Sequence, residues 1–217
     1  MHQTLIQFPE IQLRQRDGHK VRGYFAHLFR ERSTLLHNHF ADGRQIYRYP
    51  LVQYKVIGGV PTLVGIEEGA RLLIELFMEI RELEISGRRI PILSKNIRTD
   101  EWPVGVNGTL YEYTFISPWI ALNQKNYKRF ICSEASAQKA MLNNNVCSHI
   151  LSFMKGIGYY EEKRILSSAK LRAVPVQLKN QPMKGFVGTF RTNVRLPEYI
   201  GLGKSVSRGF GTLRLSR

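Results

Sequence analysis

The sequence predicts an α+β fold made of two tandem ferredoxin-like (RRM-like) βαββαβ modules. Its 217 residues suit one large domain or two small ones, and an apolar content of 43% is enough for a core. In the first half, hydrophobic patterns follow the order strand, helix, strand, strand, helix, strand, and the second half repeats this order loosely. We therefore expect one module over residues 1–100 and a second over 108–217, joined near Ile97–Gly108.

The first module contains the clearest helix in the chain, Glu67–Glu84. Its apolar residues recur at spacings of three and four, and two glutamates stand at its N-terminus, where the helix dipole favours them. A strand at Arg89–Ser94 follows it. The preceding predicted segments are an apolar/polar run at Leu5–Leu13, a helix at His19–Arg30, a run near Leu35–Phe40, and two strands, Tyr49–Ile57 and Thr62–Ile66, flanking the turn Gly58-Gly59.

The second module begins with a predicted strand at Leu110–Trp119 and a helix around Ser133–Lys155. Two long runs, Leu171–Leu178 and Phe186–Val194, form a hairpin across Asn180-Gln181-Pro182. A short turn near Leu196–Tyr199 stands where the second helix of the pattern belongs. A glycine-rich loop then leads into a last strand at Thr212–Leu215.

Positive charge is concentrated towards the C-terminal end of the chain. The net charge is +15, and from Lys163 to Arg217 there are twelve Lys or Arg residues and one acid, Glu198. A surplus of lysines that served only solubility would be spread evenly. The distribution therefore favours a polyanionic partner, with nucleic acid ahead of an anionic membrane surface because no basic amphipathic helix is present.

Membrane and metal sites are not expected. No apolar run approaches the roughly 18 residues of a spanning helix, and Met1–Pro9 lacks the regions of a signal peptide, so we expect a cytoplasmic protein. Cys132 and Cys147 have no CxxC partner, and His149 is the only histidine near them, which leaves too few ligands for zinc. We expect neither a metal nor a cofactor.

The stretch Gly201–Gly211 contains Gly-Lys-Ser but is not a phosphate-binding P-loop. A P-loop requires a glycine where Glu198 stands and a helix behind the loop, and only twelve residues follow Ser205. The dinucleotide pattern also fails, since Val206 takes the place of its third glycine. Glycines could simply make a tight turn, but interleaved basic and hydroxyl residues favour contact with a polyanion. The predicted contacts are Gly201, Gly203, Lys204, Ser205, Ser207, Arg208, Gly209 and Gly211.

The tandem modules, the charge and this loop together resemble a known family. The loop has the form GxGxxxxxGFG before the final strand, which resembles the RAMP proteins of CRISPR systems. The stretch His37–Lys55, with histidines ahead of a Tyr/Pro/Lys-rich strand, is similar to the catalytic region of the endoribonucleases that cut CRISPR precursor RNA within its repeats. Its letters His-Asn-His do not indicate a metal-dependent HNH nuclease, whose named residues are spread over a ββα element.

RNA carries its own nucleophile, the 2′-OH, so an enzyme can cleave it without a metal by moving protons and stabilising the phosphorane. The resemblance implies this reaction, with a 2′,3′-cyclic phosphate and a 5′-hydroxyl as product ends. On an extended segment His37 and His39 share a face and could act as base and acid. Tyr47 could orient the 2′-OH or replace one histidine, and Arg44 and Lys55 could stabilise the phosphorane.

The remaining charged and histidine residues have plainer interpretations. The hairpin residues position phosphates rather than read bases; they are Lys170, Arg172, Lys179, Lys184 and Arg191. His2, His19, His27 and His149 are expected to be core or surface residues, and Arg44 and Lys55 could equally be solvated charges.

Two rival functions stay open. The first is an RNA-binding RAMP subunit of a CRISPR effector complex without catalysis, in which the histidines are structural. The second is a general nucleic-acid chaperone or a DNA-binding protein, which would not prefer repeat RNA to equally charged DNA. The expected partner is CRISPR repeat RNA, and a homodimer and other CRISPR-associated proteins are further candidate partners.

Overall fold

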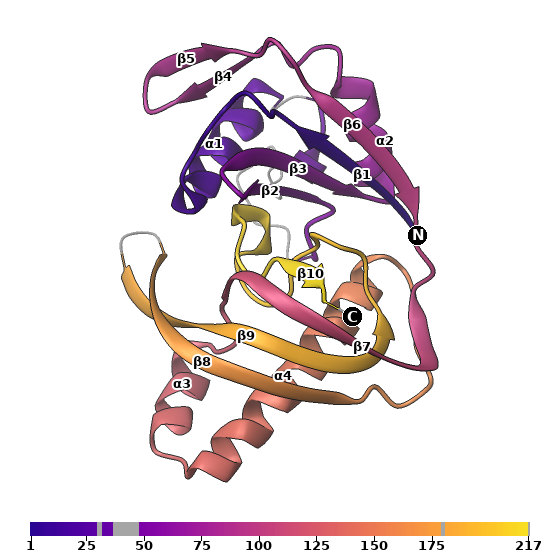
Figure 1. Cartoon of the computed structure of the whole chain (residues 1–217), viewed down its shortest axis with the longest axis vertical. Helices are drawn as coiled ribbons and strands as arrows, with labels where there is room; N and C mark the ends of the chain where they lie inside the picture. Colours follow the sequence, from indigo (N-terminus) through magenta and orange to yellow (C-terminus); the bar gives the residue numbers. More distant parts are fainter. Residues whose placement is uncertain (30–31, 37–47, 179–180, 217) are drawn as a thin grey trace. The chain divides into compact units, whose positions relative to one another are not determined.

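The computed structural model describes residues 1–29, 32–36, 48–178 and 181–216 (Figure 1). The chain divides into two compact units. The first contains Met1–Pro103 together with Val206–Gly209, and the second contains Val104–Ser205 together with Phe210–Arg217. A short segment from the end of the chain is thus part of the first unit.

The first unit is a ferredoxin-like module. Its four-stranded sheet has the order β2-β3-β1-β6, and every neighbouring pair is antiparallel. This is the order that a split βαβ repeat produces, so the predicted fold is confirmed for this half. The elements are β1 (His2–Gln7), two 3-10 turns, η1 (Gln15–Asp17) and η2 (Thr34–Leu36), α1 (Gly18–Leu28), β2 (Val52–Ile57), β3 (Val60–Ile66), α2 (Glu68–Leu76) and β6 (Asn96–Glu101).

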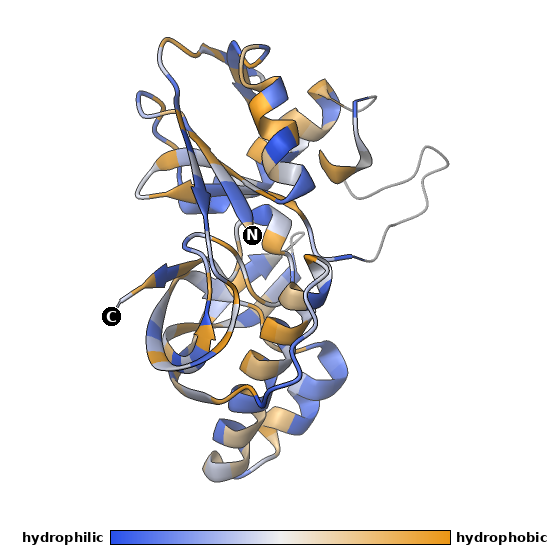
Figure 2. Ribbon diagram, turned by 90° about the vertical axis from the view of Figure 1, so that its right-hand side faces the viewer, coloured by the Kyte–Doolittle hydropathy of each residue, from blue (hydrophilic) through white to orange (hydrophobic). Residues whose placement is uncertain are grey.

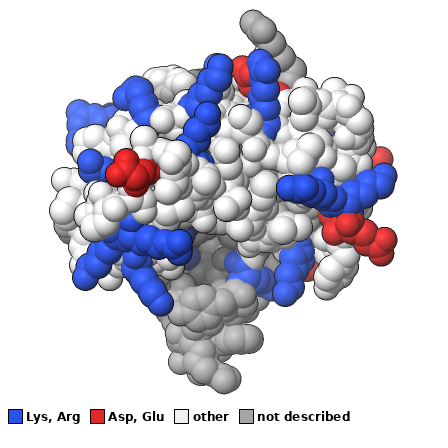
Figure 3. Space-filling view, turned by 90° about the horizontal axis from the view of Figure 1, so that it is seen from below, with Lys and Arg blue, Asp and Glu red and all other residues white. Residues whose placement is uncertain are grey.

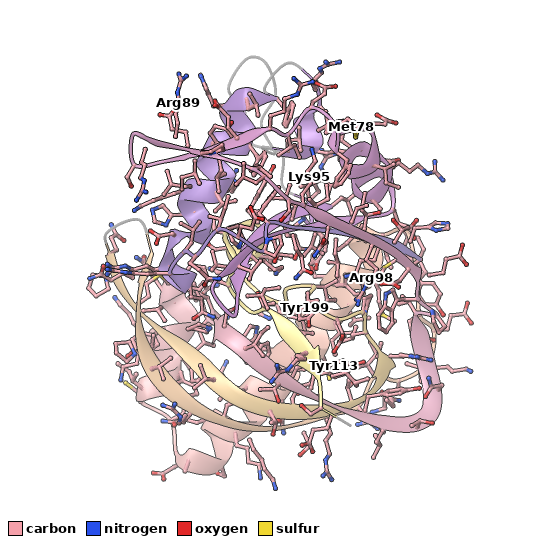
Figure 4. All side chains as sticks on the ribbon, turned by 45° about the horizontal axis from the view of Figure 1, so that its top comes forward. Met78, Arg89, Lys95, Arg98, Tyr113 and Tyr199 are labelled. Carbon is pink, nitrogen blue, oxygen red and sulfur yellow. The ribbon has the colours of Figure 1, made fainter. Side chains whose placement is uncertain are left out.

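The predicted helix Glu67–Glu84 is too long, because α2 ends at Leu76. The next residues form a hairpin of β4 (Glu82–Ile85) and β5 (Arg88–Pro91), in which Leu83 and Ile85 are buried between exposed or half-buried neighbours. This alternation has the period of a strand. Lys95 closes the helix end, since its ammonium donates to the carbonyls of Phe77 and Ile80 (Figure 4).

The fourth strand of the first sheet was also predicted at the wrong residues. The predicted strand Arg89–Ser94 contributes only to the β4–β5 hairpin, and the strand that pairs with β1 is β6. β6 lies where a linker was expected, near Ile97–Gly108, and its residues are mostly exposed. An exposed edge strand carries little hydrophobic pattern, so its sequence resembles a loop.

The core of the first unit lies between its sheet and its helices. Alternate residues of the strands, including Ile6, Tyr54 and Leu63, pack with Phe25 of α1 and Leu73 of α2. Polar and apolar residues both occur along the helices, as expected for helices that bury one side (Figure 2). No helix in the described ranges is long and apolar enough to cross a membrane.

The second unit repeats the same sheet order with longer strands. The order is β10-β7-β9-β8, again antiparallel throughout. The helix α3 was not predicted from the sequence, and it has no buried residue. Asn123 caps its N-terminus, because the Asn123 side chain accepts from the Asn126 amide at 2.7 Å. The elements are β7 (Gly105–Trp119), α3 (Gln124–Ile131), α4 (Ala135–Gly156), β8 (Ser167–Leu178), β9 (Gln181–Arg195), the 3-10 turn η3 (Val206–Arg208, in the first unit) and β10 (Leu213–Leu215).

A turn replaces the second helix of this module, as predicted. The hydroxyl of Tyr113 holds it, because it donates to the Leu196 carbonyl at 3.0 Å and accepts from the Leu196 amide at 2.7 Å (Figure 4). Nearby in the core, the indole of Trp119 donates to Nδ1 of His149 at 3.2 Å. Burial, aided by the charge of Lys204, lowers the pKa of His149 to about 4, so this histidine is neutral and structural at neutral pH.

Candidate nucleic-acid site

Four predicted site residues of the first module lie outside the described residues: His37, His39, Arg44 and Tyr47. The same is true of Lys179 in the hairpin. Their roles stay predictions. The structure does describe the residues on both sides of the stretch 37–47, Leu36 and Arg48.

The residue just before the histidine stretch is held by β2. Leu36 is 2% exposed, and its carbonyl accepts a hydrogen bond of 3.0 Å from the hydroxyl of Tyr54. After the stretch, the side-chain amide of Gln53 donates to the Tyr49 hydroxyl at 2.9 Å and to the Pro50 carbonyl at 3.1 Å. Leu36 and Tyr49, which lie on the two sides of residues 37–47 in the sequence, are therefore held by adjacent residues of β2.

Tyr54 is well suited to hold Leu36 in place. It is fully buried, and its ring stacks on Phe25 of α1 with centroids 5.9 Å apart and planes 16° from parallel. Burial raises the pKa of its hydroxyl well above the usual value, so the group stays protonated and remains a donor. The position of Leu36 thus depends on core packing as well as on one hydrogen bond.

Lys55, the next residue on β2, is 1% exposed. Burial lowers the pKa of its ammonium to about 7, because taking the group out of water disfavours its charged form. From the sequence, Lys55 was expected either to stabilise the phosphorane or to be a solvated charge. The solvated alternative is wrong, and any catalytic role must use a group whose charge titrates near neutral pH.

The segment Val206–Gly209 packs on α1 and β2 within the first unit. A Cβ at Gly18 would lie 2.9 Å from the Arg208 carbonyl oxygen, so only a glycine lets the two backbones come this close. Gly209 has a φ of +89°, and a Cβ there would lie 3.2 Å from the Tyr54 carbonyl oxygen. This part of the glycine-rich loop is therefore next to the residues that hold Leu36.

Arg22 joins this region and was not proposed from the sequence. It stands one helical turn beyond Gly18 on α1, and so on the side of the helix that meets Val206–Gly209. Burial and then the positive charge of Arg208 lower the pKa of Arg22, while Tyr54 acts in the opposite direction. The sequence does show a basic residue inside an amphipathic helix. Without the fold, however, that pattern gives no reason to assign Arg22 to a binding site.

The remaining loop residues are tied to the second unit. The amides of Lys204 and Gly211 donate to the carbonyls of Ile120 and Pro118 at 3.1 and 2.9 Å, and the Leu202 amide donates to the Gly211 carbonyl at 3.0 Å. The backbone amides of Lys204 and Gly211 are therefore already hydrogen-bonded within the protein and are not offered to phosphates. The exposed side chain of Lys204 and the half-buried hydroxyls of Ser205 and Ser207 are the groups that the loop presents.

Three basic residues of the hairpin, Lys170, Arg172 and Arg191, share one face of the second sheet. Lys170 and Arg172 alternate along β8, and the register places Arg191 of β9 opposite Ser168 on the same face. Arg191 donates from Nε to the Glu112 carboxylate at 2.6 Å, so part of its charge is already neutralised. Lys184 is exposed. Figure 3 shows several separate groups of Lys and Arg side chains on a mainly uncharged face, with acidic side chains in fewer places.

Comparison with known protein families supports the family that the sequence motifs indicated. Residues 1–102 match the model of the Cas6b N-terminal domain, and residues 105–216 match that of the Cas6b C-terminal domain. The chain belongs to the Cas6b family. The family predicted from the glycine-rich loop and the histidine stretch is therefore confirmed, as is the tandem fold.

Solved Cas6b structures resemble the whole chain. One, described as Cas6b, is 36% identical with a TM-score of 0.94 and covers 99% of this chain and 98% of that one. Another, described as the CRISPR RNA processing endoribonuclease Cas6b, is 32% identical with a TM-score of 0.79 and covers 99% of this chain and 100% of that one. An uncharacterized protein of Methanocaldococcus jannaschii is 34% identical over 140 residues, which are 64% of this chain and 95% of that protein.

Proposed function

We propose that this chain, an endoribonuclease of the Cas6b family, cleaves CRISPR precursor RNA within its repeats without a metal ion. The reaction would leave a 2′,3′-cyclic phosphate and a 5′-hydroxyl. The observation that carries the proposal is the anchoring of Leu36 by Tyr54, because it fixes the start of the His37–Tyr47 stretch in a chain whose solved relative is an RNA processing endoribonuclease.

In the proposed reaction, His37 and His39 move the protons. One accepts the proton of the 2′-OH as it attacks the adjacent phosphate, and the other donates a proton to the departing 5′-oxygen. Tyr47 orients the 2′-OH. Arg44 stabilises the phosphorane, and Lys55 does so in the fraction of molecules in which it is protonated, since the pKa of its ammonium is about 7.

The rest of the basic surface would bind the RNA backbone. The loop side chains Lys204, Ser205, Ser207 and Arg208 hold phosphates, while Gly201, Gly203, Gly209 and Gly211 allow the loop its close packing. The hairpin residues then position the strand; they are Lys170, Arg172, Lys179, Lys184 and Arg191. A homodimer and a complex with other CRISPR-associated proteins stay predictions.

The test is cleavage of end-labelled repeat RNA from the source organism in excess EDTA. We expect His37→Ala and His39→Ala to lower the cleavage rate by roughly 10²- to 10⁴-fold while RNA affinity is kept. His27→Ala is the matched control, because His27 is exposed on α1 and outside the candidate site. The product ends are identified by their sensitivity to phosphatase before and after acid opening of the cyclic phosphate.

Three results would refute the proposal in different ways. Strict dependence on Mg²⁺ would exclude the metal-independent mechanism. Tight binding with intact RNA in every lane would select the non-catalytic RNA-binding subunit. Equal competition by repeat DNA at the same salt concentration would point to a general nucleic-acid binder.

A further inference from the structure

A groove with a volume of about 420 Å³ lies between α4 and β8 in the second unit. Its α4 side includes Ala135, Gln138 and Leu142, which are three and four residues apart and therefore share one face of the helix. Its β8 side includes Ala169, Leu171 and Ala173. Apart from Gln138, these side chains are aliphatic, so much of the lining is apolar.

Hydrogen bonds hold the two walls of the groove in place. The side-chain amide of Gln138 donates to the carbonyls of Phe130 and Ser133 at 3.0 and 2.9 Å, which ties the end of α3 to the first turns of α4. The side-chain oxygen of Asn143 accepts from the Ala169 amide at 2.9 Å and joins α4 to β8. Ala169 is buried at this junction, whereas Ala173 is exposed. The groove is therefore closed beside Asn143 and opens towards Ala173.

The backbone of β8 presents unused hydrogen-bonding groups along this groove. Within the described part of the chain, β8 pairs with β9 alone, so it is an edge strand. The Ala169 amide points away from β9, because it donates to Asn143. The register to β9 has no irregularity, so the N–H and C=O groups of Leu171 and Ala173 point the same way. The groove thus borders a sheet edge to which another strand can be added.

The side chains of β8 divide into an apolar row and a basic row. Ala169, Leu171 and Ala173 face the groove, while Lys170 and Arg172 alternate with them on the other face and are exposed. Lys139 of α4 adds an exposed cation to the groove. The sequences of α3, α4 and β8 contain no acidic residue. An added strand would meet apolar side chains on one of its faces and positive charge on the other.

We infer that the edge of β8 binds an extended segment of a partner protein in which apolar and acidic residues alternate. The backbone of this segment pairs with Leu171 and Ala173, as in other cases where a peptide extends a sheet. Its apolar side chains enter the groove, and its carboxylates pair with Lys170 and Arg172 across the strands. The inference needs no part of the proposed RNA cleavage.

The lining of the groove favours a protein over RNA. Single-stranded RNA is bound largely by stacking its bases on exposed aromatic rings. Here Phe186 is 2% exposed, and the ring of Phe130 packs edge-on against it with centroids 5.6 Å apart. The Gln138 amide, which could read a base, already donates to two carbonyls. Aliphatic side chains of a peptide suit this lining better than bases do.

Charge argues against a second copy of this chain as the occupant. An antiparallel pair of two β8 strands would bring Lys170 and Arg172 of both copies onto one face, where like charges repel. Basic side chains and a proline such as Pro175 on an edge strand protect it from pairing with itself. They leave it open to a strand that carries acidic residues.

The first test measures binding of short fluorescent peptides by anisotropy. The peptides alternate Ile, Leu or Val with Asp or Glu, and the controls contain the same residues in two blocks or have Lys in place of the acids. We expect the alternating acidic peptides to bind, and we expect their binding to weaken as salt is raised. Block peptides should bind at least about tenfold more weakly, because they cannot place apolar residues on one face only.

The second test uses substitutions beside the groove. Ala173→Pro removes an N–H that points away from β9, so the sheet keeps its own bonds while peptide affinity falls about tenfold. Gln177→Pro is the matched control, since its N–H lies on the same edge beyond the groove, and it should keep the affinity. Lys139→Glu should weaken binding by about threefold at low salt. Thermal unfolding shows whether Ala173→Pro is folded, and Lys139→Glu tests the groove without a change in the backbone.

Each outcome supports or overturns the inference. Failure of every alternating peptide to bind, or equal binding of the block peptides, overturns it, as does binding that neither Ala173→Pro nor Lys139→Glu weakens. If Ala173→Pro lowers the affinity for repeat RNA as much as that for the peptide, the groove is an RNA site and the inference is wrong. Peptide binding as expected, with no cleavage of repeat RNA by the natural protein, would support it while the proposed function fails.

Discussion

At the scale of single residues, Tyr54 and Lys55 show how burial on one strand shifts the pKa values of two neighbouring side chains in opposite directions. Both are buried on β2, and their side chains point to opposite faces of the sheet. Burial raises the pKa of the tyrosine and so preserves a neutral donor, whereas it lowers the pKa of the lysine to about 7 and weakens a cation. Environment, rather than residue type, therefore decides what each group can do.

Tyr54→Phe tests whether the anchor of Leu36 matters for catalysis. The substitution removes the hydroxyl and leaves a buried carbonyl without its donor, so we expect the free energy of unfolding to fall by about 1 kcal/mol. We also expect kcat for repeat RNA to fall several-fold at nearly constant KM, because the histidine stretch loses its fixed start. Single-turnover cleavage and urea unfolding measure the two effects.

Tyr24→Phe is the control for this variant, since Tyr24 also packs on Phe25 and is only half-buried. Tyr24→Phe should change neither the free energy of unfolding nor kcat strongly. An unchanged kcat in Tyr54→Phe would show that the hydrogen bond to Leu36 has no part in positioning the catalytic stretch.

At the scale of elements, the glycine-rich loop is a packing device as well as a candidate binding loop. Gly201–Ser205 and Phe210–Gly211 are tied to the strands of the second unit, while Val206–Gly209 packs in the first. Its glycines are needed where backbone meets backbone. The loop can therefore present side chains at a fixed place, whereas several of its backbone amides are already hydrogen-bonded to carbonyls of the protein.

Gly211→Ala and Gly58→Ala separate backbone strain from steric conflict. The two glycines have nearly the same φ, +62° and +59°, but a Cβ at Gly211 would lie 2.0 Å from the Leu202 carbonyl oxygen and a Cβ at Gly58 meets nothing within 4 Å. We expect Gly58→Ala to cost about 1 kcal/mol. Gly211→Ala should cost about 3 kcal/mol or more, because the backbone of the loop must also move.

Thermal and urea unfolding of both variants provide the measurement. Equal losses of stability would mean that the loop around Gly211 adjusts freely. That result would also weaken the view that the loop holds Arg208 and Lys204 at fixed positions.

At the scale of the whole molecule, a net charge of +15 favours RNA and at the same time works against folding. The fold limits this cost at buried positions by keeping some basic groups neutral. Lys55, whose pKa burial lowers to about 7, is such a case. Burial also lowers the pKa of His149 to about 4, although the net charge of +15 already counts histidines as neutral. The proton binding of His149 therefore links the stability of the second unit to pH.

The sign of this linkage follows from the two pKa values. The folded value of about 4 is below the ordinary 6.5, so an unfolded chain binds a proton that the folded chain does not. The contribution of His149 to stability is complete above pH 6.5 and is lost as pH falls towards 4, a loss of up to about 3 kcal/mol. His149→Gln should remove this part of the pH dependence.

Urea unfolding from pH 7 to pH 4.5 measures the effect, with Trp102→Phe as background so that Trp119, which donates to His149, is the only tryptophan. Parallel pH profiles with and without His149 would contradict the prediction. They would show that the imidazole remains accessible to protons in the folded state.

The sequence by itself determined the ferredoxin-like pattern of both halves and the family, and it favoured a polyanionic partner. Each depends on local signals: the period of apolar residues in Glu67–Leu76, the glycine pattern of Gly201–Gly211, and the run of basic residues after Lys163. Local signals were misleading where packing decides the outcome. The exposed strand β6 was taken for a linker, and Glu82–Glu84, the start of β4, was added to a helix because Leu83 fits the helical period as well.

Only the tertiary structure decided which residues meet. The bond from Tyr54 to Leu36 joins positions 18 residues apart, and the approach of the Arg208 backbone to Gly18 joins positions 190 residues apart. The burial of Lys55 depends on what covers its sheet. Sequence spacing carries no information about such distances. The physical reason is that proton affinity and charge repulsion depend on separation in space and on exclusion of water, and both are set by the packing of segments that are remote along the chain.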